Sequence, residues 1–503
     1  MKTPLSEKIA KNPWIGWALF LGTMIFVFVL GLLAASIIQR RTEANLMNTP
    51  KYKIDEFEPR NEAWGLAFPR EYQTYSQMSD TLFRSKYGGS AFRDLLEEDP
   101  RLVILFAGYP FSKDFNQARG HVYSVVDLYN TLRTGTPANE NEGPQNSSCW
   151  ACKSPDVARV MAKMSPSDFY KTKWSAMLSE IANPIGCANC HNPKDMTLRL
   201  YQVPLKEAYA RMGKNVESFP LNQMRTMVCA QCHVEYYFKG DDKYVTFPWD
   251  KGLNVDDIEK YYDEYNFTDW IHPLSKTPII KAQHPDFELF QHSIHYQRGV
   301  SCADCHMPYI TEGSQKITDH KVQSPLNNIE ASCMVCHKQT KEELIKNVYD
   351  RQDKVYNQKI VLEDLLVKAH IEAKFAWDNG ANEKIMEPVL KLIRQAQWRW
   401  DFVAASHGAS FHAPLESMRI IADGIEKASE ARLLLSRVHA SLGHNEPIPM
   451  PDLSSKEKAQ TYVGIDFKKL KREKEEWKKN VLPKWLQLVK EREQNMPLPE
   501  RIM

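Results

Sequence analysis

Residues 302–306 read CADCH, in which two cysteines are separated by two residues and followed immediately by a histidine. The same C-x-x-C-H pattern recurs at residues 187–191, 229–233 and 333–337. A fifth pair, at residues 149–153, reads CWACK and ends in lysine instead. The five pairs together use every cysteine of the chain, which are Cys149, Cys152, Cys187, Cys190, Cys229, Cys232, Cys302, Cys305, Cys333 and Cys336.

The C-x-x-C-H pattern is the attachment signature of haem c. Residues i and i+3 share one face of a helical turn, so both thiols can bond to the two vinyl groups of one porphyrin. The next residue can then bind the iron from below. Two alternatives explain less: four-cysteine zinc sites would need an even number of pairs, and disulfides would not account for the histidines. We therefore predict five haem c groups, with CWACK included by analogy, and iron ligands at Lys153, His191, His233, His306 and His337.

Length and charge restrict the remaining possibilities. The chain has 503 residues, enough for one large domain or two to three ordinary ones. Its 65 lysines and arginines against 63 acidic residues give a net charge of +2. Because nucleic-acid binding normally requires a strongly basic surface, we expect no nucleic-acid partner.

The N-terminal segment 1–41 contains 25 consecutive uncharged positions, Trp14–Ile38. This is long enough to cross a bilayer as a helix. It is longer than the apolar run of a secretory signal, which favours an uncleaved anchor, although Ala34-Ala35-Ser36 could form a cleavage site. Since covalent haems are attached on the exported side, we expect the rest of the chain in the periplasm, attached to the cytoplasmic membrane.

The pattern changes after the last motif, which suggests a haem-bearing region over 42–340 and a helical region over 341–503. Residues 341–375 lack Pro and Gly and carry Val348, Val355, Leu362 and Ala369 at seven-residue spacing, which predicts a long amphipathic helix. This stripe could serve an ordinary core or a dimer face. Further helices are predicted at 383–406 and 415–442, and a solvated helix, broken once near Pro483, at 468–494. We therefore expect a mainly α-helical fold with little sheet.

The lysine of CWACK requires a specific explanation. Histidine binds iron as a neutral imidazole at neutral pH, whereas a lysine must first lose a proton. A haem that only relays electrons gains nothing obvious from this change. A reactive haem gains a strong donor that alters the electronics of its opposite face. The alternative is that Lys153 is a surface residue and another group binds that iron.

CWACK followed by four C-x-x-C-H motifs, together with GHVYSVVDLYNTLRTG (120–135), CHVEYYF (232–238) and KAQHP (281–285), resembles the ammonia-forming pentahaem cytochrome c nitrite reductases. The similarity runs from about Arg119 to Pro414. It implies a multihaem cytochrome c fold with a haem-packed core and long C-terminal helices, assembled as a homodimer. It also implies nitrite as the substrate. The expected electron donor is a membrane cytochrome that oxidises quinol, or another electron carrier in its place.

The resemblance also assigns residues. Lys153 matches the proximal ligand of the active-site haem, and Arg133, Tyr236 and His284 match its distal pocket. The remaining four haems each receive a second histidine: His121 for the third motif, His320 for the second, His295 for the fifth and His412 for the fourth, with His407 as the alternative to His412. A calcium site is implied at Glu235, the carbonyls of Tyr236 and Lys281, and the amide oxygen of Gln283.

The residue chemistry agrees with this assignment. A cationic arginine and a protonatable histidine can attract an anion, hydrogen-bond its oxygens and supply protons, and a tyrosine adds a donor. Calcium prefers carboxylate and carbonyl oxygens. The competing hypothesis is an electron-transfer cytochrome, in which a second protein ligand would close the CWACK haem. Hydroxylamine oxidation is disfavoured, because those enzymes carry more haems.

Overall fold

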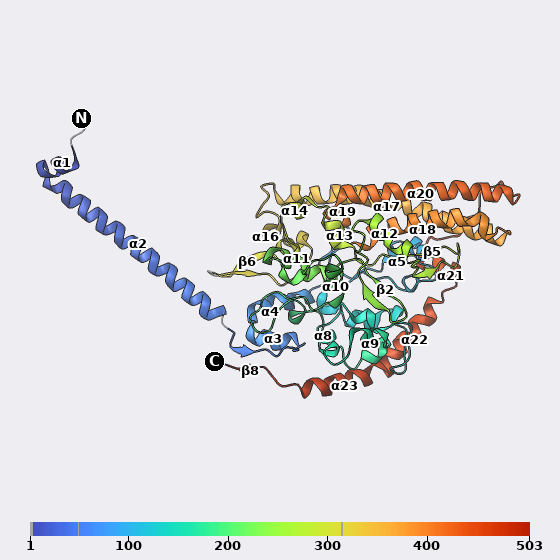
Figure 1. Ribbon diagram of the computed structural model, residues 1–503, viewed down its shortest axis with the longest axis horizontal. Helices are drawn as coiled ribbons and strands as arrows, with labels where there is room; N and C mark the ends of the chain where they lie inside the picture. The colour runs from blue at the N-terminus through green and yellow to red at the C-terminus, as the bar shows by residue number, and fades with distance from the viewer. Residues whose placement is uncertain (1–3, 49, 313–314, 503) are drawn as a thin grey trace.

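The computed structural model describes residues 4–48, 50–312 and 315–502. Helices dominate it, and most of those before residue 340 are short (Figure 1). They are α1 Leu5–Lys11, α2 Pro13–Asn48, α3 Asn61–Ala67, α4 Pro69–Ser76, α5 Leu95–Glu98, α6 Arg101–Leu105, α7 Val126–Asn130, α8 Asp156–Met161, α9 Pro166–Lys171, α10 Val203–Arg211, α11 Leu221–Ala230, α12 Val255–Glu264, α13 Asp286–Phe290, α14 Ile294–Gln297, α15 Cys302–His306 and α16 Ile329–Ser332.

The later helices are long and form a layer along one side of the molecule (Figure 1). The predicted helices at 341–375, 383–406 and 415–442 are confirmed as α17 Lys341–Asp378, α18 Glu383–Ala405 and α20 Pro414–Ser441, with the short α19 Ala409–His412 between the last two. Helix α17 begins at a capping box, in which Thr340 and Glu343 bond to each other's backbone N–H. The layer buries its own apolar cluster, which is Ala369, Ala373, Ala376, Met386, Val389, Ile393, Ala431, Leu435 and Val438.

Most of the seven-residue stripe of α17 faces the interior of the chain, where Val355 and Leu362 join the large central cluster and Ala369 joins that of the layer. Val355, Leu362 and Ala369 are almost completely buried within the chain itself. Val348, at the start of the stripe, is partly exposed and lines the cavity, so three of the four predicted positions are core and the stripe provides no argument for a dimer face. Apolar side chains on other faces of the layer remain exposed, among them Val361 and Leu433.

Strands are few and short, as predicted. Among the described residues they form four antiparallel two-stranded sheets: β1 Tyr52–Lys53 with β8 Glu500–Arg501, β2 Tyr237–Lys239 with β3 Tyr244–Thr246, β4 Trp270–Ile271 with β5 Pro278–Ile279, and β6 Tyr309–Glu312 with β7 Gln315–Thr318. The first of these joins the two ends of the folded body. The chain therefore finishes beside the segment that follows α2 (Figure 1).

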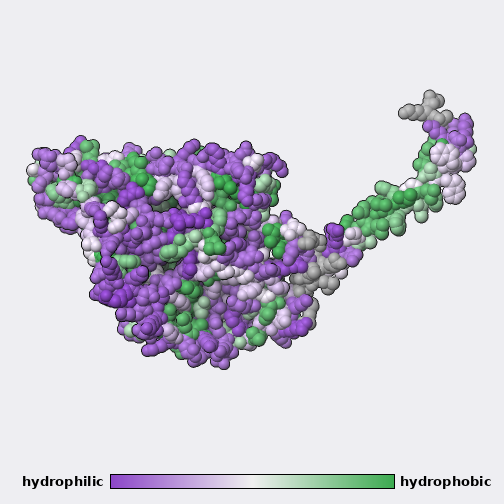
Figure 2. Space-filling model, turned by 180° about the vertical axis from the view of Figure 1, so that it is seen from behind, coloured by the Kyte–Doolittle hydropathy of each residue, from purple (hydrophilic) through white to green (hydrophobic). Residues whose placement is uncertain are grey.

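Helix α2 projects away from the folded body (Figure 1). Its segment Pro13–Thr42 is long and apolar enough to cross a membrane, and the most apolar part is not buried against the rest of the chain. Figure 2 shows this segment as a hydrophobic rod beside a largely hydrophilic body. The arrangement fits a membrane anchor or a signal segment.

The last three helices are α21 Lys456–Tyr462, α22 Phe467–Asn480 and α23 Leu482–Gln494. Helices α22 and α23 run along the side of the body opposite the long-helix layer (Figure 1). The predicted single break near Pro483 is confirmed by the end of α22 at Asn480 and the start of α23 at Leu482. The expectation of a solvated helix is wrong in part, because Lys474 and Trp477 of α22 are buried.

Candidate haem-lined active site

A cavity of about 2050 Å³ runs through the central region of the molecule, which contains the five motifs (residues 149–337). This is roughly twice the upper end of the usual volume of a small-ligand pocket, about 1,000 Å³. All ten cysteines line it, together with Lys153, Arg133 and His284. The motifs that are scattered over residues 149–337 therefore open into one continuous space.

The motifs adopt the local turn that the attachment chemistry requires. The backbone N–H groups of His191, His233 and His337 each donate to the carbonyl of the first cysteine of their motif, at 2.9 Å. The fourth motif is itself the helix α15. In CWACK the turn is tighter, because Lys153 N donates to Trp150 O at 2.9 Å. In every motif the residue after the second cysteine is thus held close to the two sulfurs.

The geometry gives no support to the two alternative uses of the cysteines. No disulfide joins any of the ten, all of which lie in the described part of the chain. Within residues 4–48, 50–312 and 315–502, no group of three or more His, Cys, Asp or Glu side chains is placed to hold a metal ion. The thiols remain available for thioether bonds.

Four pairs of imidazole rings face each other across the cavity. An imidazole nitrogen binds a first-row metal at about 2.0–2.1 Å, so two rings on opposite sides of one iron have centroids roughly 6.4 Å apart. The observed centroid distances are 6.1 Å for His191–His320, 6.4 Å for His233–His121, 6.2 Å for His306–His412 and 6.2 Å for His337–His295. Each pair joins one motif histidine to the distal histidine that the resemblance implies for it.

The second ring nitrogen of several of these histidines already has a partner. The Nδ1 atoms of His191, His306 and His320 lie 2.8, 2.8 and 2.9 Å from backbone carbonyl oxygens. Such a bond fixes the ring and leaves Nε2 for a metal. Burial lowers the pKa of His121 and of His191 to about 4, so these imidazoles are neutral, as iron binding requires. The residues present therefore fit haem.

The two candidate distal ligands of the fourth motif, His407 and His412, lie in different places. The ring of His412 faces His306, whereas His407 stacks on His284, with centroids 5.9 Å apart and planes 19° from parallel. Gly408 permits the turn between them, because a Cβ at this position would lie 2.2 Å from Cε1 of His412. The arrangement supports His412 as the ligand, and places His407 beside the predicted distal pocket.

Neighbouring motifs approach one another in a defined series. Gln202 Nε2 lies 3.6 Å from Cys152 Sγ and 4.0 Å from Cys232 Sγ, so CWACK adjoins the third motif.

Further along the cavity, the thiols of Cys302 and Cys229 are hydrogen-bonded, and this contact and burial raise the pKa of Cys302 well above its ordinary value. Burial and the neighbouring Cys333 raise the pKa of Cys305 to about 12. The third motif therefore adjoins the fourth, and the fourth adjoins the fifth.

The predicted distal pocket brings Arg133, Tyr236 and His284 to one part of the cavity. The Arg133 guanidinium lies 4.5 Å from the centre of the Phe111 ring, and burial lowers its pKa, an effect that Asp114 opposes. Burial raises the pKa of Tyr236 well above 10, so its hydroxyl stays protonated and can donate.

His284 lies beside this tyrosine, with ring centroids 6.4 Å apart. Burial, His407 and Lys153 hold the pKa of His284 well below 6.5. The ring is therefore neutral at neutral pH in the protein alone, and not half-protonated as an exposed histidine would be.

The predicted calcium ligands also converge. The buried Glu235 accepts hydrogen bonds through Oε2 from Gln283 N at 2.6 Å and through Oε1 from the Tyr262 hydroxyl at 2.9 Å. The side-chain amide of Gln283 lies 3.4 Å from Lys281 O.

Two buried acids at this position form no ion pair of their own. Burial raises the pKa of Glu235 well above its usual range and that of Glu288 to about 8. Lys281 opposes the rise at Glu235, but its Nζ is paired with Asp401 at 2.7 Å, and neither glutamate takes part in an ion pair among the described residues. Buried carboxylates without a counter-charge are costly, so this cluster fits a bound cation such as calcium.

Sequence reasoning missed Asp286, two residues after His284. Its Oδ1 accepts from the Ser406 hydroxyl at 2.7 Å and from Gly408 N at 3.1 Å, and its Oδ2 lies 3.6 Å from His233 Nδ1. The carboxylate joins the KAQHP segment to the segment of His407 and to His233 of the third motif. Its proximity to His284 was the only signal in the sequence, and an acid beside a histidine is common on protein surfaces.

The comparisons with known proteins agree on one family. The chain matches the cytochrome c552 family over residues 60–494. Cytochrome c-552 of Parabacteroides distasonis is 53% identical over 497 residues, which cover 99% of this chain and 100% of that protein. Cytochrome c-552 of Porphyromonas gingivalis is 52% identical over 479 residues, covering 95% and 96%.

A solved structure agrees. The cytochrome c nitrite reductase from Desulfovibrio desulfuricans, described with two calcium sites in its catalytic subunit, is similar with a TM-score of 0.72 at 30% identity. The match covers 90% of this chain and 98% of that one. The predicted multihaem cytochrome fold is confirmed by this likeness.

Proposed function

The chain belongs to the cytochrome c552 family, and on that basis we propose that it is a periplasmic enzyme that reduces nitrite to ammonium. Its similarity to a cytochrome c nitrite reductase over nearly the whole length of both chains supports this activity. The cofactors of the enzyme are haem c and calcium. Haem c supplies iron that accepts and passes on single electrons.

One observation carries the proposal. Four motif histidines each face a second histidine at the spacing of a shared iron, whereas the fifth motif ends in Lys153 and opens into a pocket with different chemistry. We assign four haems with two histidines each to electron transfer, and the lysine-ligated haem to substrate. The series from CWACK through the third, fourth and fifth motifs supports a continuous electron path.

The pocket side chains have separate roles in this assignment. Arg133 attracts the nitrite anion and donates to its oxygens through a planar guanidinium. The Tyr236 hydroxyl adds a donor. His284 is neutral before the anion arrives, and an anion beside it favours the charged form, so the ring can take up a proton with the substrate and deliver it as N–O bonds break.

Calcium, in this proposal, is held by Glu235, by the carbonyls of Tyr236 and Lys281 and by the amide oxygen of Gln283. Its effect on the reaction is positional. The ion would fix the backbone that carries Tyr236 and His284, because Glu235 directly precedes Tyr236 and Gln283 directly precedes His284. The buried, unpaired carboxylates of Glu235 and Glu288 support this placement.

The cellular setting belongs to the same proposal. The apolar segment Pro13–Thr42 would anchor the protein to the cytoplasmic membrane, with the haem region in the periplasm. Such an anchor suits an electron donor in that membrane, for which we propose a cytochrome that oxidises quinol. A homodimer remains part of the proposal on family resemblance, and the exposed apolar residues of the long-helix layer are its candidate contact.

The test is an EPR spectrum of the oxidised protein before and after nitrite is added. We expect one high-spin haem whose signal changes with nitrite, alongside low-spin haems that do not respond. Lys153→His keeps both thioether cysteines and should retain its haem while nitrite turnover falls. Low-spin signals from every haem, unchanged by nitrite, would instead identify an electron-transfer cytochrome.

A further inference from the structure

Helix α22 is rich in charged residues, yet it buries one lysine completely. Lys474 is 2% exposed, and its aliphatic stem and ammonium pack over Trp477, with Nζ 4.3 Å from the ring centre. The Nζ atom donates to Thr134 Oγ1 at 3.0 Å and to Gly135 O at 2.7 Å. A buried lysine is uncommon and costly unless its donors are satisfied, so the position calls for an explanation.

Both acceptors belong to the segment that carries Arg133. This segment, residues 131–137, contains the single turn Leu132–Thr134 and then Gly135 with a φ of 67°, a conformation that favours glycine. Trp477 Nε1 donates to Pro137 O at 2.6 Å, so α22 holds the segment at a second point. From the opposite side, Asp114 Oδ2 accepts from Leu132 N at 3.0 Å.

We propose that Lys474 is a positioning residue that fixes the 131–137 segment, and thereby the guanidinium of Arg133, for binding nitrite. The inference rests on the proposed role of Arg133. The side chain of Arg133 is long, and its own local partner is Thr131, whose Oγ1 lies 3.1 Å from Arg133 Nε. The orientation of the guanidinium therefore depends on how firmly this short segment is held.

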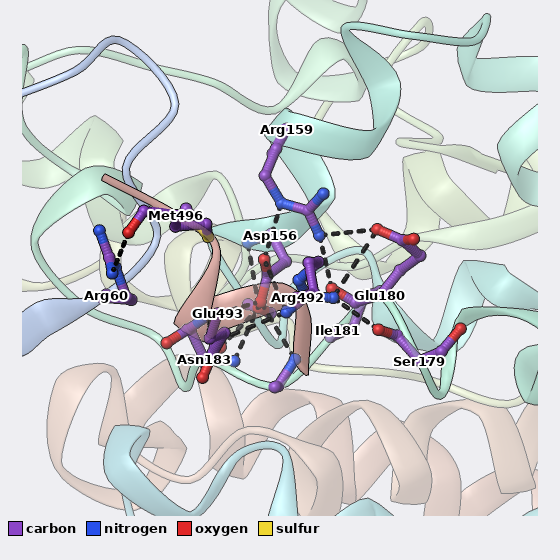
Figure 3. Close-up of polar contacts among 12 residues, drawn as sticks. Arg60, Asp156, Arg159, Ser179, Glu180, Ile181, Asn183, Arg492, Glu493 and Met496 are labelled. Carbon is purple, nitrogen blue, oxygen red and sulfur yellow. Dashed lines mark hydrogen bonds and ion pairs between the residues drawn. The ribbon is translucent and has the colours of Figure 1, made fainter. Parts of the chain in front are cut away.

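Helix α22 is restrained from its C-terminal end, because the helix that follows it is anchored to the rest of the chain. The following helix α23 is joined to the chain beyond CWACK, where Arg492 Nη1 donates to Ser179 O at 2.6 Å and Asn183 Nδ2 donates to Glu493 Oε1 at 2.8 Å (Figure 3). The buried Asp156, three residues after Lys153, accepts from Asn183 Nδ2 at 3.0 Å. The C-terminal helices thus contact segments adjoining both Lys153 and Arg133.

The contact does not depend on the charge of the lysine. Burial, with the nearby Lys478, lowers the pKa of Lys474 to about 7. A neutral amine still has two N–H donors, and two acceptors face it. Apolar replacements of similar length keep the packing on Trp477 but leave Gly135 O without this donor, which loosens the segment.

The experiment compares Lys474→Met with Lys471→Met, a substitution of an exposed lysine one turn earlier on the same helix. Nitrite affinity is measured by optical titration of the oxidised, fully haem-loaded protein, together with KM and kcat and with hydrogen exchange of residues 131–137. For Lys474→Met we expect about ten-fold weaker nitrite binding and a similar rise in KM, with kcat changed less than about three-fold. Exchange at Gly135 N, which donates to Leu132 O at 3.1 Å, should accelerate.

Trp477→Phe is the gentler second variant. It retains an aromatic ring beneath Lys474 while removing the donor to Pro137 O and part of the buried ring volume, so the same changes should appear at smaller size even if Lys474→Met does not fold. The inference would be overturned if Lys474→Met and Trp477→Phe left nitrite affinity and hydrogen exchange unchanged, or if Lys471→Met lost as much affinity as Lys474→Met. Arg133→Ala separates the two proposals: if it weakens nitrite binding while Lys474→Met does not, only the positioning role fails. If Arg133→Ala has no effect, the pocket assignment and the inference fail together.

Discussion

The central region and the long-helix layer differ in what fills their interiors. The central region surrounds a cavity of about 2050 Å³ that is lined by cysteines, histidines and charged side chains. The layer of α17, α18 and α20 is packed with its own apolar residues, many of them alanines that let the helices approach closely. The central region also packs apolar side chains such as Phe106 and Trp150, but its cavity needs a covalent cofactor to fill it, whereas the cluster of the layer depends only on side-chain packing.

This difference indicates where stability and chemistry can be altered independently. A change that prevents haem attachment should affect the central region more than the layer. A change that creates a void in the layer should reduce stability without altering the pocket. The predictions below test that separation, in order of decreasing effect.

The largest effect is expected from Cys302→Ser combined with Cys305→Ser, which removes the attachment of the fourth motif. Without that haem, part of the central cavity stays unfilled and the side chains that line it are left unpacked. Residues 187–337 should therefore lose protection from hydrogen exchange. Segments 369–376, 386–393 and 431–438, which form the apolar cluster of the layer, should stay protected. Equal loss of protection in both regions would show that the layer cannot fold without the haems.

Next in size is Arg133→Ala, within the cavity. Loss of one donor aimed at developing charge costs about 100- to 1,000-fold in kcat/KM, and we expect a fall of this size for nitrite. Arg133→Lys keeps the charge without the planar fork and should recover only part of the activity. Haem absorbance and thermal unfolding should match the parent, because the residue contributes to chemistry and not to the core. Parent-like nitrite kinetics in both variants would rule out this pocket.

In the layer, Leu435→Ala should show the reverse pattern. Leu435 is fully buried in the apolar cluster, and its truncation should lower the free energy of unfolding by about 2–5 kcal/mol. Leu433, two residues earlier and 54% exposed, provides the control, since Leu433→Ala should change stability by less than about 0.5 kcal/mol. KM for nitrite and haem content should not change in either variant. A changed KM in Leu435→Ala would mean that the layer and the pocket are coupled.

The smallest effect concerns pH. His370 of α17 is buried, its ring stacked on His272 with centroids 3.8 Å apart, and burial lowers the pKa of His370 to about 4. An unfolded chain has a histidine pKa near 6.5, so between pH 6.5 and 4 the unfolded state binds a proton that the folded state does not. Stability should therefore fall as the pH falls through this window, by up to roughly 3 kcal/mol for this residue.

Thermal unfolding of the parent and of His370→Gln at pH 7 and at pH 4.5 measures this contribution. The variant should lose less stability on acidification than the parent does. Gln397, whose Oε1 lies 2.6 Å from His370 Nε2, can accept from the new amide and limit other damage. An identical loss of stability in both proteins would contradict the assigned pKa.

Much of the fold could be predicted because its signals are local. The helices α17, α18 and α20 begin and end within one to three residues of the predicted positions, since Pro, Gly and capping residues mark them in the sequence. The single break between α22 and α23 was visible for the same reason. What the periodicity could not reveal was the partner of each apolar face, so the stripe of α17 was as consistent with a dimer as with the internal core it forms.

The site divides in the same way. Covalent attachment requires a fixed spacing along the chain, so a haem-binding role of the ten cysteines and of the residue after each pair could be predicted from spacing alone. The distal histidines have no such constraint, and only the resemblance assigned them. Among residues 407 and 412, the sequence left two histidines open, and the facing rings of His306 and His412 distinguish them.

By itself, then, the sequence determined where the five cysteine pairs lie, that one motif differs from the other four, and where the long helices run, and it predicts haem attachment at those pairs. Each of these follows from residues within a few positions of one another. Only the tertiary structure revealed that the paired imidazoles lie at the spacing of a shared iron, that Asp286 joins two segments, and that Lys474 is buried against the segment of Arg133. The charge-rich segment 468–494 gave no sign of that contact, because a lysine that packs and one that is solvated differ only in what the rest of the chain places beside them.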